Sequence, residues 1–252
     1  MTGFPGVHTG RIAVVTGAAA GLGRAYAERL ARDGAQVVVA DVSDGSETVE
    51  SIAEAGGQAM ATSCDVSSPE SVESLRATVQ QRFGRCDILV NNAGLHAPVS
   101  WKTLTFDQWR RVLSVNLDSM FLTCKAFAPA MEDHGFGRIV NISSNTFDLV
   151  QPGFVHYISS KGGVIGFTRA LATELGNAGI TVNCVLPGLT KTASIEAELT
   201  GTPVLDVVAG MQAIHRTAVP ADIEGTISFL ATDDAGWITG QSIVVDGGQV
   251  RH

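Results

Sequence analysis

The sequence is poor in the features that direct a chain to nucleic acid, to membranes or to an oxidising compartment. Its 252 residues include 17 Lys and Arg against 25 Asp and Glu, a net charge of −8, with no basic cluster. This balance disfavours binding to nucleic acid or to anionic membranes. No apolar run is long enough to span a membrane. Residues 1–10 lack a basic region followed by an apolar stretch, so we expect no secretion signal and a cytoplasmic protein.

Cysteine is also scarce, and its spacing argues against the common cysteine-based sites. Cys64, Cys86, Cys124 and Cys184 form no CxxC pair and no metal-binding pattern. The histidines show no metal-binding spacing either. We therefore expect buried free thiols and no bound metal.

Apolar residues make up 45% of the chain and follow two alternating patterns. Strands are expected at residues 11–16, 36–40, 58–61, 87–90, 138–142, 181–185 and 242–245. Helices are expected at residues 22–32, 44–55, 69–83, 105–131, 154–176 and 221–230. This alternation predicts an α/β fold with a single domain over residues 1–252: a doubly wound, Rossmann-like parallel sheet of about seven strands with helices on both faces.

The longest break in this alternation runs from residue 188 to residue 219 and carries mixed apolar and small residues. Long insertions in compact domains are often lids or binding loops. We predict a substrate lid at about residues 189–215. A pair of packed helices is the alternative, and the two interpretations are compatible because a lid can be helical.

A glycine-rich turn follows the first expected strand. The sequence TGAAAGLG (16–23) places Gly17, Gly21 and Gly23 between that strand and a helix. Such a turn can bring backbone N–H groups and the positive end of the helix dipole against a pyrophosphate. The spacing is not the usual GxGxxG of dinucleotide-binding proteins. A tight connection whose glycines only permit close packing is the alternative.

Asp41 ends the second expected strand, 18 residues after Gly23. A doubly wound fold places at this point the acid that binds the ribose hydroxyls of adenosine. A carboxylate here would repel the 2′-phosphate of NADP, and neither Ala20 nor Val42 supplies a basic group to accept that phosphate. We therefore predict NAD as the cofactor. The alternative is a helix cap at the end of the strand, a role that Ser43 could also fill.

Tyr157 and Lys161 are four residues apart at the start of a long helical pattern, which places them on one helix face. A phenol titrates at about pH 10, and a neighbouring ammonium group favours the phenolate and lowers that pKa. A tyrosine of this kind can take a proton from an alcohol or give one to a ketone. Many surface helices carry the same pair without such a role, so the pair is informative only in combination.

Seven motifs together resemble the short-chain dehydrogenase/reductase family in order and in approximate spacing, over nearly the whole chain from Gly10 to Gly248. The motifs are TGAAAGLG (16–23), NNAG (91–94), Asn116, Ser144, Tyr157, Lys161 and Pro187-Gly188. The ending DGGQVRH (246–252) and the run GGVIGFTRALA (162–172) also resemble two subgroups, the bacterial 1-phenylethanol dehydrogenases and the pyridoxal 4-dehydrogenases.

The resemblance implies four catalytic residues. Tyr157 would be the general acid/base, and Lys161 would lower its pKa and bind the nicotinamide ribose. Ser144 would orient the substrate oxygen, with Ser143 as its rival. Asn116 would bend its helix and support a proton relay to Lys161, although a satisfied polar residue inside a helix is the alternative.

The cofactor site implied by the resemblance extends from the glycine turn to the end of the sixth strand. Its residues are Gly17, Gly21, Leu22, Gly23, Asp41, Asp65, Val66, Asn92, Ala93, Gly94, Tyr157, Lys161, Pro187, Gly188, Leu189, Thr190 and Thr192. A turn aspartate before Ser67 explains Asp65 equally well. Residues 91–94 and 187–188 could likewise be plain turns.

These residues predict an NAD-dependent oxidoreductase that transfers a hydride between nicotinamide and a secondary alcohol or its ketone, with an aromatic or alicyclic substrate. The expected substrate contacts are Ser144, His96, Asn145, Leu149, Val150 and Tyr157. One alternative is a 3-ketoacyl-carrier-protein reductase, which usually uses NADPH and a basic docking patch; Asp41 and the acidic residues 132–133 oppose this. A pyridoxal-type dehydrogenase is a second alternative. A dinucleotide sensor would typically lack one of the Ser, Tyr and Lys residues.

Small residues at Gly162, Gly166 and Ala170 form a stripe on the expected Tyr157 helix. The resemblance implies that this helix pairs across a two-fold axis, so we expect a homo-tetramer. Close packing within one subunit is the alternative.

Overall fold

Seven parallel strands form one sheet in residues 6–251, the part of the chain that the computed structural model describes. Residues 1–5 and His252, the last residue of the DGGQVRH ending, lie outside the described part. The strands are β1 (Ile12–Thr16), β2 (Gln36–Asp41), β3 (Gln58–Ser63), β4 (Ile88–Asn91), β5 (Gly137–Ile142), β6 (Ile180–Pro187) and β7 (Ser242–Val245). Their order in the sheet is β3-β2-β1-β4-β5-β6-β7, so the strand order reverses between β1 and β4.

Burial on both faces explains the composition of the central strands. Every residue of β1, β4, β5 and β6 is buried. Neighbouring residues of β1 enter opposite layers, because Val14 packs with residues of α3, α5 and α7 whereas Val15 packs with residues of α1, α2 and α10. A parallel sheet that is covered on both faces requires such continuous apolar runs.

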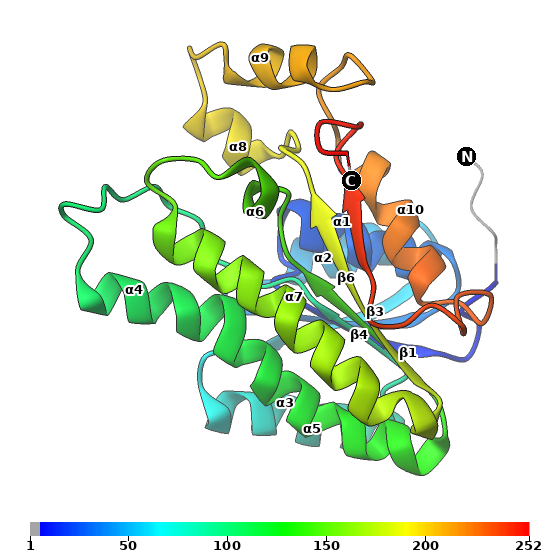
Figure 1. The fold of residues 1–252 in the computed structure, drawn as a ribbon. Coiled ribbons are helices and arrows are strands. Elements are labelled where there is room, and N and C mark those ends of the chain that lie inside the picture. Colours follow the sequence, from blue (N-terminus) through cyan, green and yellow to red (C-terminus); the bar gives the residue numbers. More distant parts are fainter. Residues whose placement is uncertain (1–5, 252) are drawn as a thin grey trace.

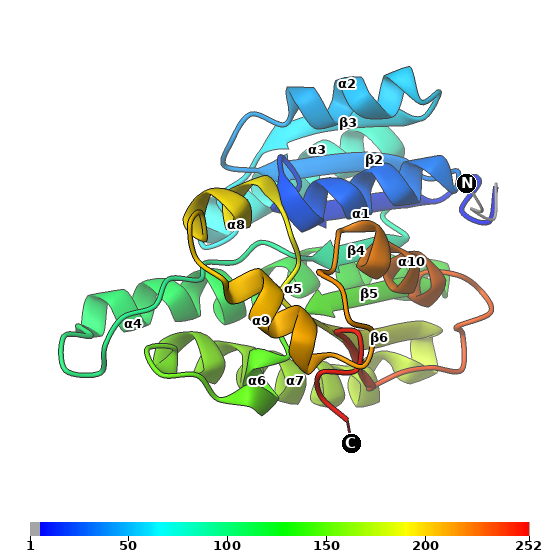
Figure 2. The same ribbon diagram turned by 90° about the horizontal axis from the view of Figure 1, so that it is seen from above.

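Helices cover both faces of the sheet, as Figures 1 and 2 show. One face carries α1 (Gly21–Arg32), α2 (Ser46–Glu54) and α10 (Ala221–Leu230), and the other carries α3 (Pro69–Phe83), α5 (Ser119–His134) and α7 (Val155–Leu175). The predicted fold class, a doubly wound Rossmann-like parallel sheet, is therefore confirmed.

The predicted helix at residues 105–131 is divided in the structure. α4 (Phe106–Leu113) begins at a capping box formed by Thr105 and Gln108, and α5 ends at Gly135 with a left-handed φ of 66°. Ser114–Asp118 between them form a π-helical segment. A π-helical segment adds one residue to a helical turn and changes the apolar pattern of the sequence very little. The polar Asn116 within an otherwise apolar helix is therefore its only sign in the sequence.

The region of the predicted lid contains two short helices, α8 (Ala193–Glu198) and α9 (Val204–Met211). They lie above the C-terminal ends of the strands in Figure 1, and α6 (Thr146–Leu149) follows the end of β5. Neither α8 nor α9 contains a buried residue. A parallel bridge between Thr190 and Ala218 joins the two ends of the region. The lid region is therefore helical, as the alternative interpretation allowed.

The four cysteines are buried free thiols, as predicted. Burial raises the pKa of the Cys184 thiol to about 12, although Lys161 close by lowers it. Among residues 6–251, no helix is both long enough and apolar enough to cross a membrane.

A buried polar network fastens the start of the chain to α1 and α10. The ring nitrogen Nε2 of His8 lies 3.0 Å from the Ser228 hydroxyl, which donates to Asp33 at 2.5 Å, and Arg29 donates to the same carboxylate at 2.7 Å. His8, Asp33 and Ser228 are all buried. Burial lowers the pKa of His8, although the Asp33 carboxylate and the Ser228 bond raise it.

This network predicts a loss of stability in mild acid. A histidine whose pKa is lowered by folding contributes stability above its unfolded pKa of about 6.5, and the contribution is lost as the pH falls toward the lower folded value. We expect the free energy of unfolding, measured by urea denaturation, to fall between about pH 7 and pH 5. In His8→Gln this fall should be smaller, and at pH 7.5 the free energy of unfolding should stay within about 1 kcal/mol of the wild type. The exposed His134→Gln is the control. A slope unchanged by His8→Gln would contradict the prediction.

Candidate active site

A cavity of about 700 Å³ opens at the C-terminal ends of the strands, beneath α8 and α9. All of the residues predicted to bind the cofactor line it, from Gly17 in the first loop to Thr192 before α8. Ser144, Tyr157 and Lys161 line it as well, together with three of the predicted substrate residues, His96, Asn145 and Leu149. Asn116 lies fully buried behind its wall, and Val150 lies outside it.

The glycine turn is packed backbone against backbone. Gly17 has a φ of 64°, and a Cβ there would lie 2.8 Å from the Ala93 Cα. A Cβ at Gly23 would lie 2.0 Å from the Gly17 carbonyl oxygen. Close packing therefore requires glycine at both positions, and both glycines also line the cavity.

Gly21 has a different environment, which fits a dinucleotide. Its φ is 60°, and the nearest neighbour of a Cβ there would be the Thr192 side chain at 3.8 Å, across the cavity. α1 begins at Gly21, and no side chain caps its first turn. The free N–H groups and the positive end of the helix dipole there suit a pyrophosphate.

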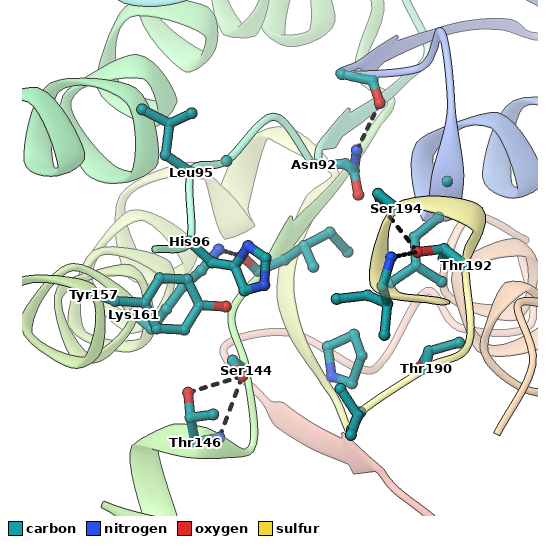
Figure 3. Close-up of a pocket in the computed structure, with 18 of the residues that line it drawn as sticks. Asn92, Leu95, His96, Ser144, Thr146, Tyr157, Lys161, Thr190, Thr192 and Ser194 are labelled. Atoms are coloured by element: carbon teal, nitrogen blue, oxygen red, sulfur yellow. Dashed lines mark hydrogen bonds between the residues drawn. The ribbon is translucent and has the colours of Figure 1, made fainter. Parts of the chain in front are cut away.

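Hydrogen bonds fix the loop after β4 against the glycine turn. The Asn92 side-chain nitrogen donates to the carbonyl groups of Thr16 and Gly17, both at 3.0 Å. The Thr16 hydroxyl in turn accepts from the backbone N–H groups of Asn92 and Ala93. Figure 3 shows Asn92 in this contact above the cavity. Asn92 therefore joins the loop after β4 to the glycine turn.

Asp41 holds the glycine turn and the turn after β2, and it does not cap α2, whose N-cap is Gly45. One carboxylate oxygen accepts from the Ala19 N–H of the glycine turn, and the other accepts from the Ser43 N–H, both at 2.9 Å. The same side chain lines the cavity. Asp65 forms the turn expected from its sequence context, with Ser67 donating from its N–H and hydroxyl groups, and these bonds lower the pKa of Asp65.

The π-helical segment directs the Asn116 amide onto the loop after β4. Its oxygen accepts from the Leu95 N–H at 2.7 Å, and its nitrogen donates to the Leu95 carbonyl at 2.9 Å and to the Ser160 hydroxyl at 3.1 Å. The residue is thus a satisfied polar group that also positions the cavity wall. A Cβ at Gly94 would lie 3.5 Å from the Asn116 oxygen and 3.6 Å from the Lys161 Nζ, so both groups border the same small space.

Tyr157, Ser144 and Lys161 meet at the centre of the cavity. Figure 3 shows the Tyr157 hydroxyl directed between His96 and Ser144. The Ser144 oxygen accepts from the Thr146 N–H at 3.2 Å and from the Thr146 hydroxyl at 2.9 Å. The Lys161 Nζ donates to the Ile142 carbonyl at 2.8 Å and lies 5.5 Å from the centre of the Tyr157 ring. Ser143, the rival of Ser144, instead donates to the Lys161 carbonyl at 2.9 Å.

The electrostatics of this group differ from the expectation from sequence. Burial raises the pKa of Tyr157, and the Ser144 hydroxyl lowers it. Burial also lowers the pKa of Lys161 to about 8, with Cys184 raising it. Lys161 was expected to lower the phenol pKa, but here its ammonium group is directed at the Ile142 carbonyl. Desolvation, which disfavours both charged forms, is the dominant influence.

Aromatic and polar residues surround Tyr157 on the substrate side. The rings of Phe154 and His96 meet the Tyr157 ring edge to face, with centroids 5.8 and 6.4 Å away. Asn145 donates to Asp246 and to Gln249, which ties the C-terminal segment to the cavity. Val150, a predicted substrate contact, is 69% exposed, and its φ of 48° turns the chain away after α6.

Several lining residues had no signal in the sequence. Glu198 on α8, Gln151 after α6, Arg111 on α4 and Gln249 near the C-terminus all line the cavity. Gln249 lies in the DGGQVRH ending, but the other three belong to no motif, because their positions depend on how separate segments come together at the strand ends.

Comparison with known proteins agrees with this geometry. The family model described as Enoyl-(Acyl carrier protein) reductase matches residues 17–249. The chain is 40% identical over 247 residues to a 3-oxoacyl-[acyl-carrier-protein] reductase of Synechocystis sp., covering 96% of this chain and 98% of that protein. It is also 40% identical over 244 residues to the (2S)-[(R)-hydroxy(phenyl)methyl]succinyl-CoA dehydrogenase subunit BbsD of Thauera aromatica, covering 95% and 96%.

A solved structure described as a short-chain dehydrogenase/reductase from Burkholderia xenovorans superposes with a TM-score of 0.92 at 36% identity, covering 97% of this chain and 98% of that one. The chain therefore belongs to the short-chain dehydrogenase/reductase family of oxidoreductases, which use a nicotinamide cofactor.

Proposed function

We propose that this protein is an NAD-dependent dehydrogenase that interconverts a secondary alcohol, aromatic or alicyclic, and its ketone. The observation that carries the proposal is the grouping of the Tyr157 and Ser144 hydroxyls with the Lys161 ammonium on one cavity wall. An absorbance screen for NADH formation over aromatic, alicyclic and sugar alcohols plus pyridoxal tests it. Failure of every alcohol to reduce NAD would contradict the proposal.

Each residue of this wall has a distinct task. The bound nicotinamide supplies the hydride acceptor or donor. Tyr157 takes the hydroxyl proton of the alcohol, or returns it to the ketone. Ser144 holds the substrate oxygen as charge develops there. A protonated Lys161, 5.5 Å from the centre of the Tyr157 ring, would favour the phenolate against the desolvation that raises the phenol pKa. Asn116 holds the loop at Gly94, next to the Lys161 Nζ.

Residues of several segments support an apolar substrate. Leu149 and Phe154 line the cavity beside Tyr157, and Ile195, Leu199 and Val204 line it from the lid region. The phenyl group in the name of the Thauera relative fits such a lining. An apolar lining is also what supports the proposed likeness to the 1-phenylethanol dehydrogenases and the pyridoxal 4-dehydrogenases.

A second candidate is a 3-oxoacyl-[acyl-carrier-protein] reductase, the name of the Synechocystis relative. The 40% identity over almost the whole chain favours it. Two carboxylates that line the cavity argue against it. Asp41 would repel the 2′-phosphate of NADPH, and Glu198 on α8 adds negative charge where an acidic carrier protein would need a basic surface. Turnover of an acyl-carrier-protein-linked ketone at a higher kcat/KM than any free ketone would establish this alternative.

The lid also belongs to the proposal. Residues 189–215 would close over the cavity of a single catalytic domain, because α8 and α9 contribute lining residues yet contain no buried ones. A segment held by so few buried contacts can open locally at low cost. Its closure would keep water from the path of the hydride.

We further propose that the protein assembles as a homo-tetramer through α7. Gly162 does not contribute to this surface, because a Cβ there would lie 2.8 Å from the Phe147 ring of the same subunit. Gly166 has no neighbour within 4 Å of its Cβ position, and Ala170 is exposed. The open part of the predicted stripe is therefore the half that contains Gly166 and Ala170.

Replacement of Tyr157 by Phe tests the proton-transfer role. The ring contacts with His96 and Phe154 remain, so we expect NADH binding, measured by fluorescence titration, to stay within about twofold. We expect kcat to fall by about 10²–10⁴-fold, which is typical of the loss of a general acid/base. The matched control is Phe at the only other tyrosine, Tyr26, which is buried in the core. Substantial activity of Tyr157→Phe between pH 6 and pH 10 would show that another group transfers the proton.

Asp41 predicts a preference for NAD over NADP of at least about tenfold in kcat/KM. A clash between its carboxylate and a 2′-phosphate at a partly buried site would amount to about 1–3 kcal/mol. Asp41→Asn, which keeps an acceptor for the Ala19 N–H, should reduce the ratio severalfold. The control is Asp44→Asn, an exposed change three residues away. Equal use of both cofactors by the wild type would refute the assignment.

Assembly is tested by light scattering. We expect the wild type to have four times the mass of one chain, and Gly166→Arg to have a lower mass because the side chain blocks close helix approach. Ala77→Arg, an exposed change on α3, is the control and should leave the mass unchanged. A monomeric wild type would exclude the tetramer.

A further inference from the structure

One histidine–carboxylate contact, which is an ion pair when the imidazole is protonated, connects α8 of the lid region with the catalytic wall. The Nε2 of His96 lies 3.4 Å from a carboxylate oxygen of Glu198, the last residue of α8. The two side chains are 42% and 46% exposed, and both line the cavity. The pair therefore spans the cavity mouth from the loop after β4 to the lid.

The His96 end of this pair is held firmly. The preceding residue, Leu95, exchanges two backbone hydrogen bonds with the Asn116 amide at 2.7 and 2.9 Å. The imidazole ring also meets the Tyr157 ring edge to face. Figure 3 shows His96 beside the Tyr157 hydroxyl. The backbone that carries His96 is thus anchored, and its ring lies at the Tyr157 end of the cavity.

The Glu198 end belongs to a lightly anchored helix. α8 has no buried residue, and Thr192 caps its start from within the same segment. Its other carboxylate, Glu196, pairs with Lys191 at 2.8 Å, so both partners of that pair also lie in the lid region. Glu198 differs because its partner belongs to the protein body.

We propose that His96 and Glu198 are positioning residues that form a latch, which holds α8 closed over Tyr157 and keeps the substrate in the cavity. The kinetic part of this inference rests on the proposed dehydrogenase function, whereas the structural part does not. The latch carries no proton in the reaction. It raises the fraction of molecules in which the lid is closed, and the substrate binds to that closed form.

Hydrogen exchange of the cofactor-free protein tests the latch without any assay of activity. When His96 is protonated, a half-exposed ion pair of this kind would shift the equilibrium between open and closed lid by about 1.5- to 5-fold. We expect His96→Phe, which keeps a ring against Tyr157, and Glu198→Gln each to speed exchange of the α8 amides by this factor. The double variant should exchange no faster than the faster single variant, because either change already breaks the pair.

Glu196→Gln is the matched control, since it removes the same charge from the same helix but leaves the contact with the body intact. We expect its α8 exchange to equal that of the wild type. Equal acceleration by Glu196→Gln and Glu198→Gln, or additive effects in the double variant, would overturn the latch.

Kinetics give a second and separate readout. We expect KM for the alcohol to rise about 1.5- to 5-fold in Glu198→Gln, which leaves the His96 side chain in place, with kcat within about twofold of the wild type. A fall in kcat of more than about tenfold in His96→Phe would assign His96 to the chemistry and overturn its role in positioning. If no alcohol reduces NAD at all, the proposed function fails while the exchange result still decides the latch.

Discussion

Close contact of backbone with backbone where the strand order reverses is the constraint on which the rest of the site depends. Gly17 and Gly23 leave no room for a side chain, and Asn92 is hydrogen-bonded across the same junction. The loop after β4 is held from its other side by the Asn116 amide at Leu95. Because this loop is fixed on two sides, the cofactor half of the cavity has one geometry, which is what hydride transfer between two bound molecules requires.

Burial is the second determinant of the chemistry. Lys161 is buried and Tyr157 partly so; desolvation raises the pKa of the phenol and lowers that of the ammonium. The neutral phenol suits proton donation to a ketone, whereas alcohol oxidation needs the charged lysine to stabilise the phenolate. A pair tuned mainly by desolvation responds strongly to any charge that enters the cavity, since the surrounding dielectric constant is low.

The two halves of the cavity are built in different ways. The loops from Gly17 to Gly23 and after β4 rest on buried strands, whereas α8 and α9 line the other side of the cavity and have no buried residues. Rigid support suits a cofactor of constant shape. Lightly held helices can accept different side chains without disturbing the sheet, so the lining of the cavity can change while the wall around Tyr157 stays the same.

The sequence alone determined the alternation of strands and helices, the glycine turn and the positions of Tyr157, Lys161, Ser144 and Asp41, because these depend on local pattern and on motifs of fixed spacing. It could not show the π-helical segment at Asn116, the exposure of Val150 or the direction of the Lys161 ammonium. Those features depend on which neighbours each group meets. The contact between His96 and Glu198 joins residues about a hundred positions apart, and only tertiary structure, which brings separate strand ends to one edge of the sheet, could place them together.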